Sequence, residues 1–511
     1  MKHNLYKWQQ ECLDQWIHNN YHGIVDVTTG AGKTYFSCAA ILHLRKIYPR
    51  LRIRIVVPTI MLARQWRNTL LADAVTSIGM QNGQHKDDPD RDITIYVINS
   101  ARYTISRHIL SDFANGHPVL LIADECHHYG STENSHIFDF IRYRDESADQ
   151  YYSLGLSATP FSETNRSILT QSLGNVIFRY HATEATNDGI ISPFAIFEIA
   201  LSFCEDEWEE YEKLSLQLSI LYKKLLKAYP RLKAVPDPAF FPEIKKLASM
   251  EDEEDGLAQR YLTLSIFRKK ISILSKSRLQ CAIELIRRLP AQQRILIFCE
   301  RIEQADELKT LISDSITDRI SMYHSKMTSE AKRIALDNYR MRQTDILISC
   351  RALDEGMDVP DAEVGIVLSS TNTNRQRIQR LGRILRRSSY KHMAAIYYLY
   401  IKESSDDAAY LSDSIIENTV RLTYLAGENH FINPMYETQA ASVFNKISEN
   451  LSKKMRTEFM HCIEEGITRY DWLSNPKDLE AKMLSCQSNH ERNYWLVMKK
   501  ISENTQPDIQ T

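Results

Sequence analysis

The sequence predicts an α/β protein with two parallel-sheet domains in tandem, a helical insertion between them and a helical C-terminal extension. Three observations lead to this fold class. Short apolar runs that end in small polar or acidic residues alternate with helical patterns over residues 1–200. The same alternation returns over residues 291–401. Residues 201–290 and 402–511 instead show the apolar spacing of helices.

The composition is that of a globular protein. The chain has 511 residues, of which 43% are hydrophobic and 25% are charged, and this length suits two or three domains with their own cores. Because the formal net charge is −2, a nucleic-acid surface must come from local clustering of basic residues. Nine cysteines without a CxxC pair indicate reduced core residues, a cytoplasmic location and no zinc or iron–sulfur ligation by cysteine. The longest apolar runs are far short of a membrane span.

A glycine-rich loop between a strand and a helix is the first chemical signal. Gly23–Thr34 reads GIVDVTTGAGKT, and Tyr35–Ile47 continues as a helix of small and apolar residues. Glycines let backbone N–H groups wrap phosphate oxygens, and the helix N-terminus adds its positive dipole end. In such a loop Lys33 reaches the β- and γ-phosphates and Thr34 binds magnesium. The alternative is a glycine-rich turn without a ligand.

A strand that ends in two acids is the second signal. Leu120–His128 reads LLIADECHH, in which the apolar run stops at Asp124 and Glu125. A buried parallel strand delivers such residues to the carboxyl edge of its sheet, where ligands bind. One acid holding magnesium and the other handling a water would suit phosphoryl transfer to water. The alternative is a strand that ends in a solvated acidic turn.

Three more apolar strands complete the predicted first sheet. They are Ile53–Val57, Ile93–Ile98 and the start of Tyr151–Pro160, and each ends in small polar residues. With the strand before the loop and the strand before the acids, they alternate with helical patterns. This order predicts a doubly wound parallel sheet whose working edge lies at the strand C-termini.

The second α/β pattern ends in a basic helix. Strands are expected at Arg294–Phe298, Asp345–Ser349 and Val364–Leu368, followed by the helix NRQRIQRLGRILRR. Within that helix Arg383 and Arg386 lie about one turn apart on one face, with Arg380 a turn before. An arginine on a transferring phosphoryl group is worth about 10³–10⁵ in rate. An exposed basic helix without this role is the alternative.

The remaining regions are expected to be helical. WEEYEKLSLQLSILYKKLLKAY and LAQRYLTLSIFRKKISILSKSRLQCAIELIRRL lie in the insertion, and SDSIIENTVRLTYLAG lies in the extension. The basic residues of the insertion either follow a phosphate backbone or form a solvated helix face, and both interpretations stay open.

Together these segments resemble the motor domains of superfamily 2 helicases. The closest likeness is to the group with a DECH or DEAH box that includes XPB, RadD, UvsW and type III restriction motor subunits. VTTGAGKT looks like motif I, VVPTIMLARQW like motif Ia, DECH like motif II and SAT like motif III. ILIFCE, ALDEGMDVP and QRLGRILR look like motifs IV, V and VI.

The resemblance implies a domain organisation. Residues 1–200 would form the first RecA-like domain, which binds ATP, and residues 291–401 the second. A helical insertion or linker, residues 201–290, would join them. Residues 402–511 would form a helical accessory domain.

The resemblance also implies ATP and Mg²⁺ as cofactors and assigns site residues. The catalytic residues would be Lys33, Asp124, Glu125, Arg383 and Arg386. The residues that bind the nucleotide would be Gln9, Thr29, Gly30, Ala31, Gly32, Lys33, Thr34, Gly356, Asp358 and Arg380. The magnesium ligands would be Thr34 and Asp124. The residues that couple the nucleotide state of the ATP site to nucleic-acid binding would be His127, Ser157, Ala158, Thr159 and Gln379. The nucleic-acid contacts would be Pro58, Thr59, Ser100, His324 and Arg351.

The function implied by the resemblance is that of a nucleic-acid-dependent ATPase. We expect an ATP-driven DNA helicase or translocase, acting on single-stranded, branched or duplex DNA in repair, recombination or phage defence. Two alternatives stay open. One is a motor subunit that powers or recruits a separate nuclease or other effector in a defence or restriction complex. The other is an RNA helicase, since reading a 2′-hydroxyl has no short sequence signature.

Overall fold

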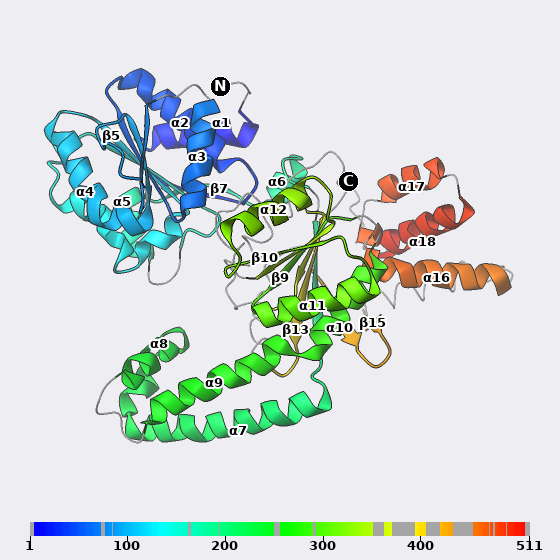
Figure 1. The fold of residues 1–511 in the computed structure, drawn as a ribbon. Helices are drawn as coiled ribbons and strands as arrows, with labels where there is room; N and C mark the ends of the chain where they lie inside the picture. The colour runs from blue at the N-terminus through cyan, green and yellow to red at the C-terminus, as the bar shows by residue number, and fades with distance from the viewer. Residues whose placement is uncertain are drawn as a thin grey trace. The chain divides into compact units, whose positions relative to one another are not determined.

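The computed structural model describes most of the chain as two compact units that divide mainly at residue 193 (Figure 1). The described residues are 5–72, 77–83, 85–161, 165–192, 194–249, 256–289, 293–350, 362–369, 394–404, 419–432, 453–469, 471–473, 476–486 and 488–505.

The described part of the first unit is built on a seven-stranded parallel sheet with the order β3-β4-β2-β5-β6-β1-β7. Its strands are β1 (Ile24–Val27), β2 (Arg52–Val57), β3 (Ile78–Gln81), β4 (Ile93–Val97), β5 (Val119–Asp124), β6 (Tyr151–Ser157) and β7 (Val176–Tyr180). Every residue of β5 is buried, as expected for a central strand that is covered on both faces. The five predicted strands are confirmed, and the sequence did not reveal the edge strands β3 and β7.

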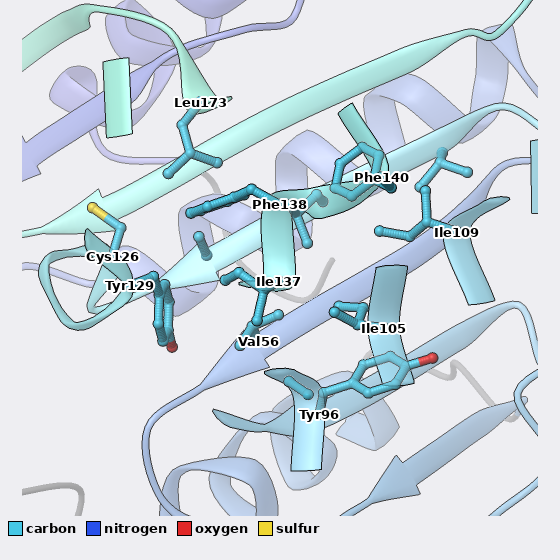
Figure 2. Packing of buried hydrophobic residues seen from close by; sticks show 14 of the residues in the cluster. Val56, Tyr96, Ile105, Ile109, Cys126, Tyr129, Ile137, Phe138, Phe140 and Leu173 are labelled. Carbon is cyan, nitrogen blue, oxygen red and sulfur yellow. The ribbon is translucent and has the colours of Figure 1, made fainter. Parts of the chain in front are cut away.

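Helices cover both faces of this sheet, with α1, α2 and α3 on one face and α4 and α5 on the other (Figure 1). The first-unit helices are α1 (Lys7–His18), α2 (Lys33–Ile47), α3 (Ile60–Ala72), α4 (Ile98–Ala114), η1 (Cys126–Gly130), η2 (Asn134–Arg142), α5 (Arg166–Leu173) and α6 (Ala182–Asn187). Figure 2 shows the apolar core beneath α4 and η2, where Val56 and Tyr96 of the sheet lie near Ile105 and Phe138. This core fixes the strands that carry the acids.

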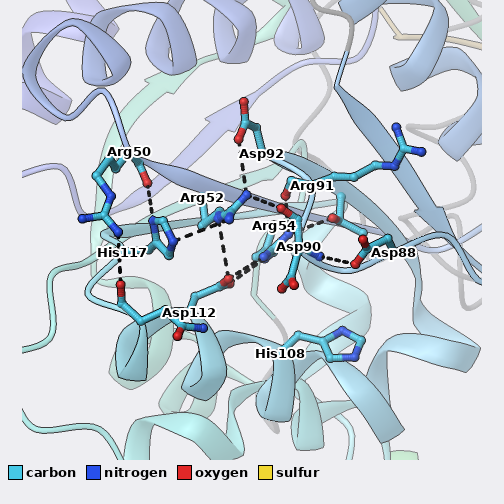
Figure 3. Close-up of polar contacts among 12 residues, drawn as sticks. Arg50, Arg52, Arg54, Asp88, Asp90, Arg91, Asp92, His108, Asp112 and His117 are labelled. Atoms are coloured by element: carbon cyan, nitrogen blue, oxygen red, sulfur yellow. Dashed lines mark hydrogen bonds and ion pairs between the residues drawn. The ribbon is translucent and has the colours of Figure 1, made fainter.

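A buried ion pair joins the first sheet to α4 (Figure 3). Arg54 on β2 is fully buried. Its guanidinium donates to both carboxylate oxygens of Asp112 on α4, over 2.8 and 2.6 Å, and to Thr94 Oγ1 over 2.7 Å. A buried arginine is tolerated only when its donors are satisfied. The pair therefore ties β2 to β4 and α4.

The described part of the second unit is built on an eight-stranded sheet with the order β10-β11-β9-β12-β13-β8-β14-β15. Its strands are β8 (Phe194–Leu201), β9 (Ile295–Cys299), β10 (Ile320–His324), β11 (Ile346–Cys350), β12 (Val364–Val367), β13 (Ala394–Ile401), β14 (Thr419–Leu425) and β15 (His430–Ile432). Strands β10, β11, β9, β12 and β13 pair in parallel, whereas β14 and β15 are antiparallel. The predicted strands of the second domain are therefore confirmed.

Two predictions about chain segments were wrong. Strand β8 pairs in parallel with β14 of the second sheet, so it does not belong to a first domain that extends to residue 200. Residues 419–425 were expected to be part of a helix, but they form β14. Their sequence, TVRLTYL, is rich in β-branched residues, which favour a strand when a partner edge such as β8 is present.

The insertion is helical, as predicted. Its helices are α7 (Glu205–Ala228), η3 (Pro230–Ala234), α8 (Asp237–Ala248), α9 (Leu257–Leu274) and α10 (Lys276–Arg288). Helices α7 and α9 lie side by side (Figure 1). Together with α8 they enclose a small separate core, to which Leu225 of α7, Ile244 of α8 and Leu262 of α9 contribute.

The other helices of the second unit are α11 (Ile302–Ser315), α12 (Ser329–Arg340), α16 (Lys453–Arg469), η5 (Asp471–Leu473), α17 (Pro476–Ser485) and α18 (Asn489–Thr505). Helices α16 and α17 both pack against α18. Among the helices of the described residues, none has the length and apolar character needed to cross a bilayer.

Candidate nucleotide-binding site

The phosphate-binding loop lies between β1 and the first residue of α2, as the sequence predicts. Gly30 and Gly32 have φ values of +86° and +96°, which residues with a Cβ rarely adopt. Lys33 begins α2, and its Nζ donates to the carbonyl oxygen of Val27 over 3.1 Å. Thr34 follows as the second residue of the helix. The loop thus presents backbone N–H groups and a lysine at a helix N-terminus, which is an anion-binding arrangement.

The two acids lie opposite this lysine. Asp124 is the last residue of β5, and Glu125 follows it with φ +50° and ψ 50°. This left-handed conformation is costly for a residue with a side chain and tends to be retained where function needs it. The Glu125 carboxylate lies 3.9 Å from Lys33 Nζ. In the sheet, β6 lies between β5 and β1. The C-terminal ends of β5, which carries the acids, and β1, which leads into the loop, therefore lie close together at the same edge.

A buried indole positions Asp124. Trp66 on α3 is fully buried, and its Nε1 donates to Asp124 Oδ2 over 2.7 Å. The other carboxylate oxygen, Oδ1, accepts the backbone N–H of Glu125 over 3.0 Å. Tyr129 donates its hydroxyl to the Asp124 carbonyl over 2.7 Å. Sequence reasoning gave neither aromatic residue a role. For Trp66 the signal was its place at the end of the segment VVPTIMLARQW, which resembles motif Ia.

Burial dominates the electrostatics of these acids. Burial and then the charge of Glu125 raise the pKa of Asp124, while the Trp66 hydrogen bond and the charge of Lys33 lower it. Burial also raises the pKa of Asp26 on β1, against the charges of His181, Arg179 and Lys33. A cation beside Asp124 would therefore favour its charged form. Buried carboxylate and threonine hydroxyl oxygens are the hard donors that magnesium prefers, so Asp124 and Thr34 fit this ion.

A polar chain joins the acids to the end of β6. His127 Nδ1 lies 3.5 Å from Glu125 Oε2 and 2.8 Å from Ser157 Oγ. Ser157 Oγ also accepts the backbone N–H of Thr159 over 3.0 Å. Ala158 lies between these two residues. The structure therefore brings together four of the five residues assigned to coupling, and the fifth, Gln379, lies outside the described residues.

Gln9 contacts the phosphate-binding loop directly. It is fully buried on α1, and its Nε2 donates to the Gly32 carbonyl over 3.2 Å while its Oε1 accepts the backbone N–H of Tyr6 over 2.9 Å. A Cβ on Gly32 would lie only 3.1 Å from this amide nitrogen. The Gln9 amide is thus bound to the phosphate-binding loop. The role of this amide in recognising adenine stays a prediction.

The expected nucleic-acid contacts lie at strand ends in both units. Pro58 and Thr59 follow β2, and Ser100 lies in the first turn of α4 after β4. Since β2 and β4 are parallel neighbours, these residues share the carboxyl edge of the first sheet. His324 ends β10 in the second sheet.

Several predicted site residues lie outside the described residues. They are Arg351, Gly356, Asp358, Gln379, Arg380, Arg383 and Arg386.

The sequence is similar to two protein families and to curated relatives of known name. The family model described as "Type III restriction enzyme, res subunit" matches residues 2–162, and the model "Helicase conserved C-terminal domain" matches residues 277–388. The chain is 28% identical over 390 residues to "DNA 3'-5' translocase XPB2" of Sulfurisphaera tokodaii, covering 76% of this chain and 79% of that protein. It is 25% identical over 394 residues to "DNA 3'-5' helicase XPB" of Mycobacterium tuberculosis, covering 76% of this chain and 59% of that protein.

Solved structures agree on the fold. The DNA-bound Type ISP restriction-modification enzyme LlaBIII has a TM-score of 0.55 at 13% identity, covering 99% of this chain and 40% of that one. The DNA-bound DUF1998 helicase MrfA has a TM-score of 0.53 at 15% identity, covering 82% of this chain and 50% of that one.

A parallel sheet with a phosphate-binding loop opposite two adjacent acids is the arrangement of a P-loop domain that binds and hydrolyses nucleotides. The two family models, matched in order, and XPB-like relatives over three quarters of the chain support a helicase of superfamily 2.

Proposed function

We propose that this chain is an ATP-driven DNA helicase or translocase that acts in repair, recombination or phage defence in the cytoplasm. The relatives named DNA 3'-5' translocase and DNA 3'-5' helicase support DNA as the substrate. The observation that carries the proposal is the approach of Lys33 and Glu125, at 3.9 Å, beside a buried Asp124. This set has the parts that phosphoryl transfer to water requires.

The proposed roles follow from the contacts of each residue. Lys33 and the loop residues Thr29, Gly30, Ala31 and Gly32 hold the phosphates. Asp124 and Thr34 hold Mg²⁺, which supplies neutralising charge to the phosphates when bound. Glu125 orients the attacking water and takes its proton, since its carboxylate is held between Lys33 and His127. Arg383 and Arg386 stabilise the charge that develops on the γ-phosphate, with support from Arg380.

Coupling to nucleic acid is proposed to run through His127. This imidazole contacts both Glu125 and Ser157, so a change at the γ-phosphate reaches the end of β6 through two contacts. Ser157 in turn holds the backbone of Thr159. The strand ends at Pro58 and Ser100 belong to the same edge, so their loops are placed to respond when this edge moves.

The domain roles are part of the same proposal. The first unit is the ATP-binding motor domain and the sheet of β9 to β13 is the second. The α7–α9 insertion and the C-terminal helices are accessory modules. Contacts with the nucleic-acid backbone at Thr59, Ser100, His324 and Arg351 would make binding depend strongly on salt and weakly on sequence.

A motor subunit that powers a separate nuclease or other effector is the second candidate. The match of residues 2–162 to the restriction-subunit family favours it. Co-purification of a stoichiometric effector whose activity needs ATP hydrolysis by this chain would support this interpretation over a motor that acts alone.

The test is steady-state ATPase activity of the purified chain without nucleic acid and with single-stranded DNA, duplex DNA, forked DNA or RNA. We expect stimulation by DNA and no turnover by Lys33→Ala in any condition. Stimulation by RNA alone would assign the RNA-helicase alternative. An ATPase rate that none of the nucleic acids changes would contradict a motor driven by nucleic acid. It would favour a motor subunit that works with a separate effector.

A further inference from the structure

Three side chains of metal-ligand type converge in the C-terminal helices, away from the nucleotide-binding residues in the sequence. His461 and Glu465 lie on α16, and His490 lies at the start of α18. Each offers one ligand atom, and these atoms all lie within 4.8 Å of one another. This cluster plays no part in the proposed ATPase mechanism.

Local structure explains why the three side chains meet. His461 and Glu465 are four residues apart in one helix, so they share a face. His490 is the second residue of α18, whose start is fixed by Ser488 Oγ accepting the backbone N–H of Glu491 over 3.1 Å. The rings of the two histidines lie 5.9 Å apart at 76°.

The apolar contact between the helices holds this arrangement. Phe459 and Cys462 on α16 are buried, as are Val497 and Ile501 on α18. The two helices pack against each other, so the ligand atoms need little ordering when an ion binds. Preorganised ligands lower the cost of binding.

His490 has a different carboxylate near each ring nitrogen. Its Nε2 lies 3.5 Å from Glu465 Oε2, and its Nδ1 lies 3.8 Å from Glu458 Oε1. Glu458 is held in turn by Asn493, whose Nδ2 donates to the same Oε1 over 2.9 Å. A carboxylate behind the nitrogen that does not bind metal is the usual support for a histidine ligand, because it orients the ring and fixes the tautomer.

We infer that His461, Glu465 and His490 form a site for a divalent transition-metal ion, with Zn²⁺ the best match to the donors. Two imidazoles and one carboxylate are a known zinc ligand set that leaves a position for water. Imidazole donors disfavour Mg²⁺ and Ca²⁺, which prefer oxygen. Zinc bonds of about 2.1 Å in a tetrahedral site place ligands about 3.4 Å apart. The pair at 3.5 Å already fits, and because all three ligand atoms lie within 4.8 Å of one another, the solvent-exposed His461 needs to move by no more than about 1.5 Å.

Such an ion would cross-link α16 to α18. Because metal affinity for the folded arrangement is folding free energy, the ion would stabilise the C-terminal helices. The competing interpretation is a surface ion-pair network of His490 with Glu458 and Glu465. Pairs as exposed as these contribute little to stability, and they need no metal.

The experiment uses the full chain, stripped with a chelator and titrated with Co²⁺ and then Zn²⁺ in excess Mg²⁺. The Mg²⁺ fills oxygen-rich sites such as the ATP site. Binding is followed by calorimetry and by the visible absorption of Co²⁺. Ligation by histidine and carboxylate gives weak visible bands, whereas ligation by any of the cysteines would add an intense near-ultraviolet charge-transfer band.

We expect one ion per chain with weak visible bands only, and a rise in melting temperature on adding Zn²⁺. His461→Ala and His490→Ala should each abolish this binding, and Glu458→Gln should weaken it by about tenfold. The matched control is His430→Ala, which removes an exposed histidine of β15 and should leave binding unchanged.

All three ligand side chains are at least partly exposed, so their replacement is expected to leave the fold intact, and circular dichroism checks this. An absence of binding in the wild-type chain would overturn the site. So would binding that persists in both histidine variants, or a thiolate charge-transfer band. A melting temperature that does not change with Zn²⁺ but falls in Glu458→Gln and in His490→Ala would assign the ion-pair network instead. None of these outcomes depends on ATPase activity.

Discussion

Replacing Trp66 by phenylalanine tests whether the buried indole prepares Asp124 for its cation. The indole N–H donates to Asp124 Oδ2 over 2.7 Å, and phenylalanine keeps most of the packing but removes this donor. A hydrogen bond to a charged group is worth about 1.5–3 kcal/mol. Since about 1.4 kcal/mol is a factor of ten, the Mg²⁺ concentration for half-maximal ATPase activity should rise by roughly 10- to 100-fold.

The pH dependence of this variant follows from the same contact. The Trp66 hydrogen bond lowers the pKa of Asp124 against the effects of burial and Glu125, so losing it raises that pKa further. A raised pKa means that the protonated form persists to higher pH. The Mg²⁺ concentration that Trp66→Phe needs for half-maximal activity should therefore increase as pH falls and decrease as pH rises.

The assay is ATPase activity as a function of Mg²⁺ at several pH values. Trp16→Phe is the matched control, because Trp16 is also fully buried in the first unit and donates its indole N–H to a neutral carbonyl, that of Ser153, over 2.9 Å. Both variants should lose roughly 1–3 kcal/mol of stability. Equal Mg²⁺ requirements in the two variants would refute the positioning role of Trp66.

Three further predictions concern turnover and stability. Glu125→Gln should retain ATP binding and lose hydrolysis. A wild-type rate of ATP cleavage by this variant in a single-turnover assay would reject Glu125 as the general base. Arg383→Ala should lower the ATPase rate by about 10³–10⁵ with ATP affinity little changed, and an unchanged rate would reject its role. Asp112→Ala should lower the free energy of unfolding in urea by roughly 3–5 kcal/mol because it leaves Arg54 buried without its partner. Asp92→Ala, which removes a half-exposed carboxylate that lies 3.3 Å from both Arg45 and Arg52, should cost about 0–1 kcal/mol. Equal losses in those two variants would contradict this account of the buried pair.

Local patterns along the chain predicted the strand–loop–helix that carries Lys33 and the strand that ends in Asp124. A short run of residues is enough to recognise the loop that ends in Lys33 and the strand that ends in Asp124. A buried parallel strand then places its last residues at the carboxyl edge of the sheet. Their convergence depends on both strands running parallel in one sheet and on the strand order, in which only β6 lies between them. The approach of Lys33 to Glu125 is then a consequence of the fold class.

Contacts between distant side chains could not be predicted in this way. Trp66 and Asp124 are separated by 58 residues, and no spacing rule connects them. The burial of Arg54 depends on Asp112, also 58 residues away.

Strand pairing explains the two segments that were predicted wrongly. The assignment of β8 to the first domain failed because neighbours in sequence need not share a sheet. Residues 419–425 were assigned to a helix because the apolar residues before them follow a helical period, but pairing with β8 decided their structure.

The most direct test of the central claim is ATP-dependent strand displacement from forked or triplex-bearing DNA by the wild-type chain and Glu125→Gln side by side. We predict displacement by the wild type with ATP, none with a non-hydrolysable analogue, and none by Glu125→Gln although it binds DNA. Displacement that is equal in the two proteins, or that proceeds without hydrolysis, would contradict the account of this chain as a motor driven by the Lys33–Glu125 site.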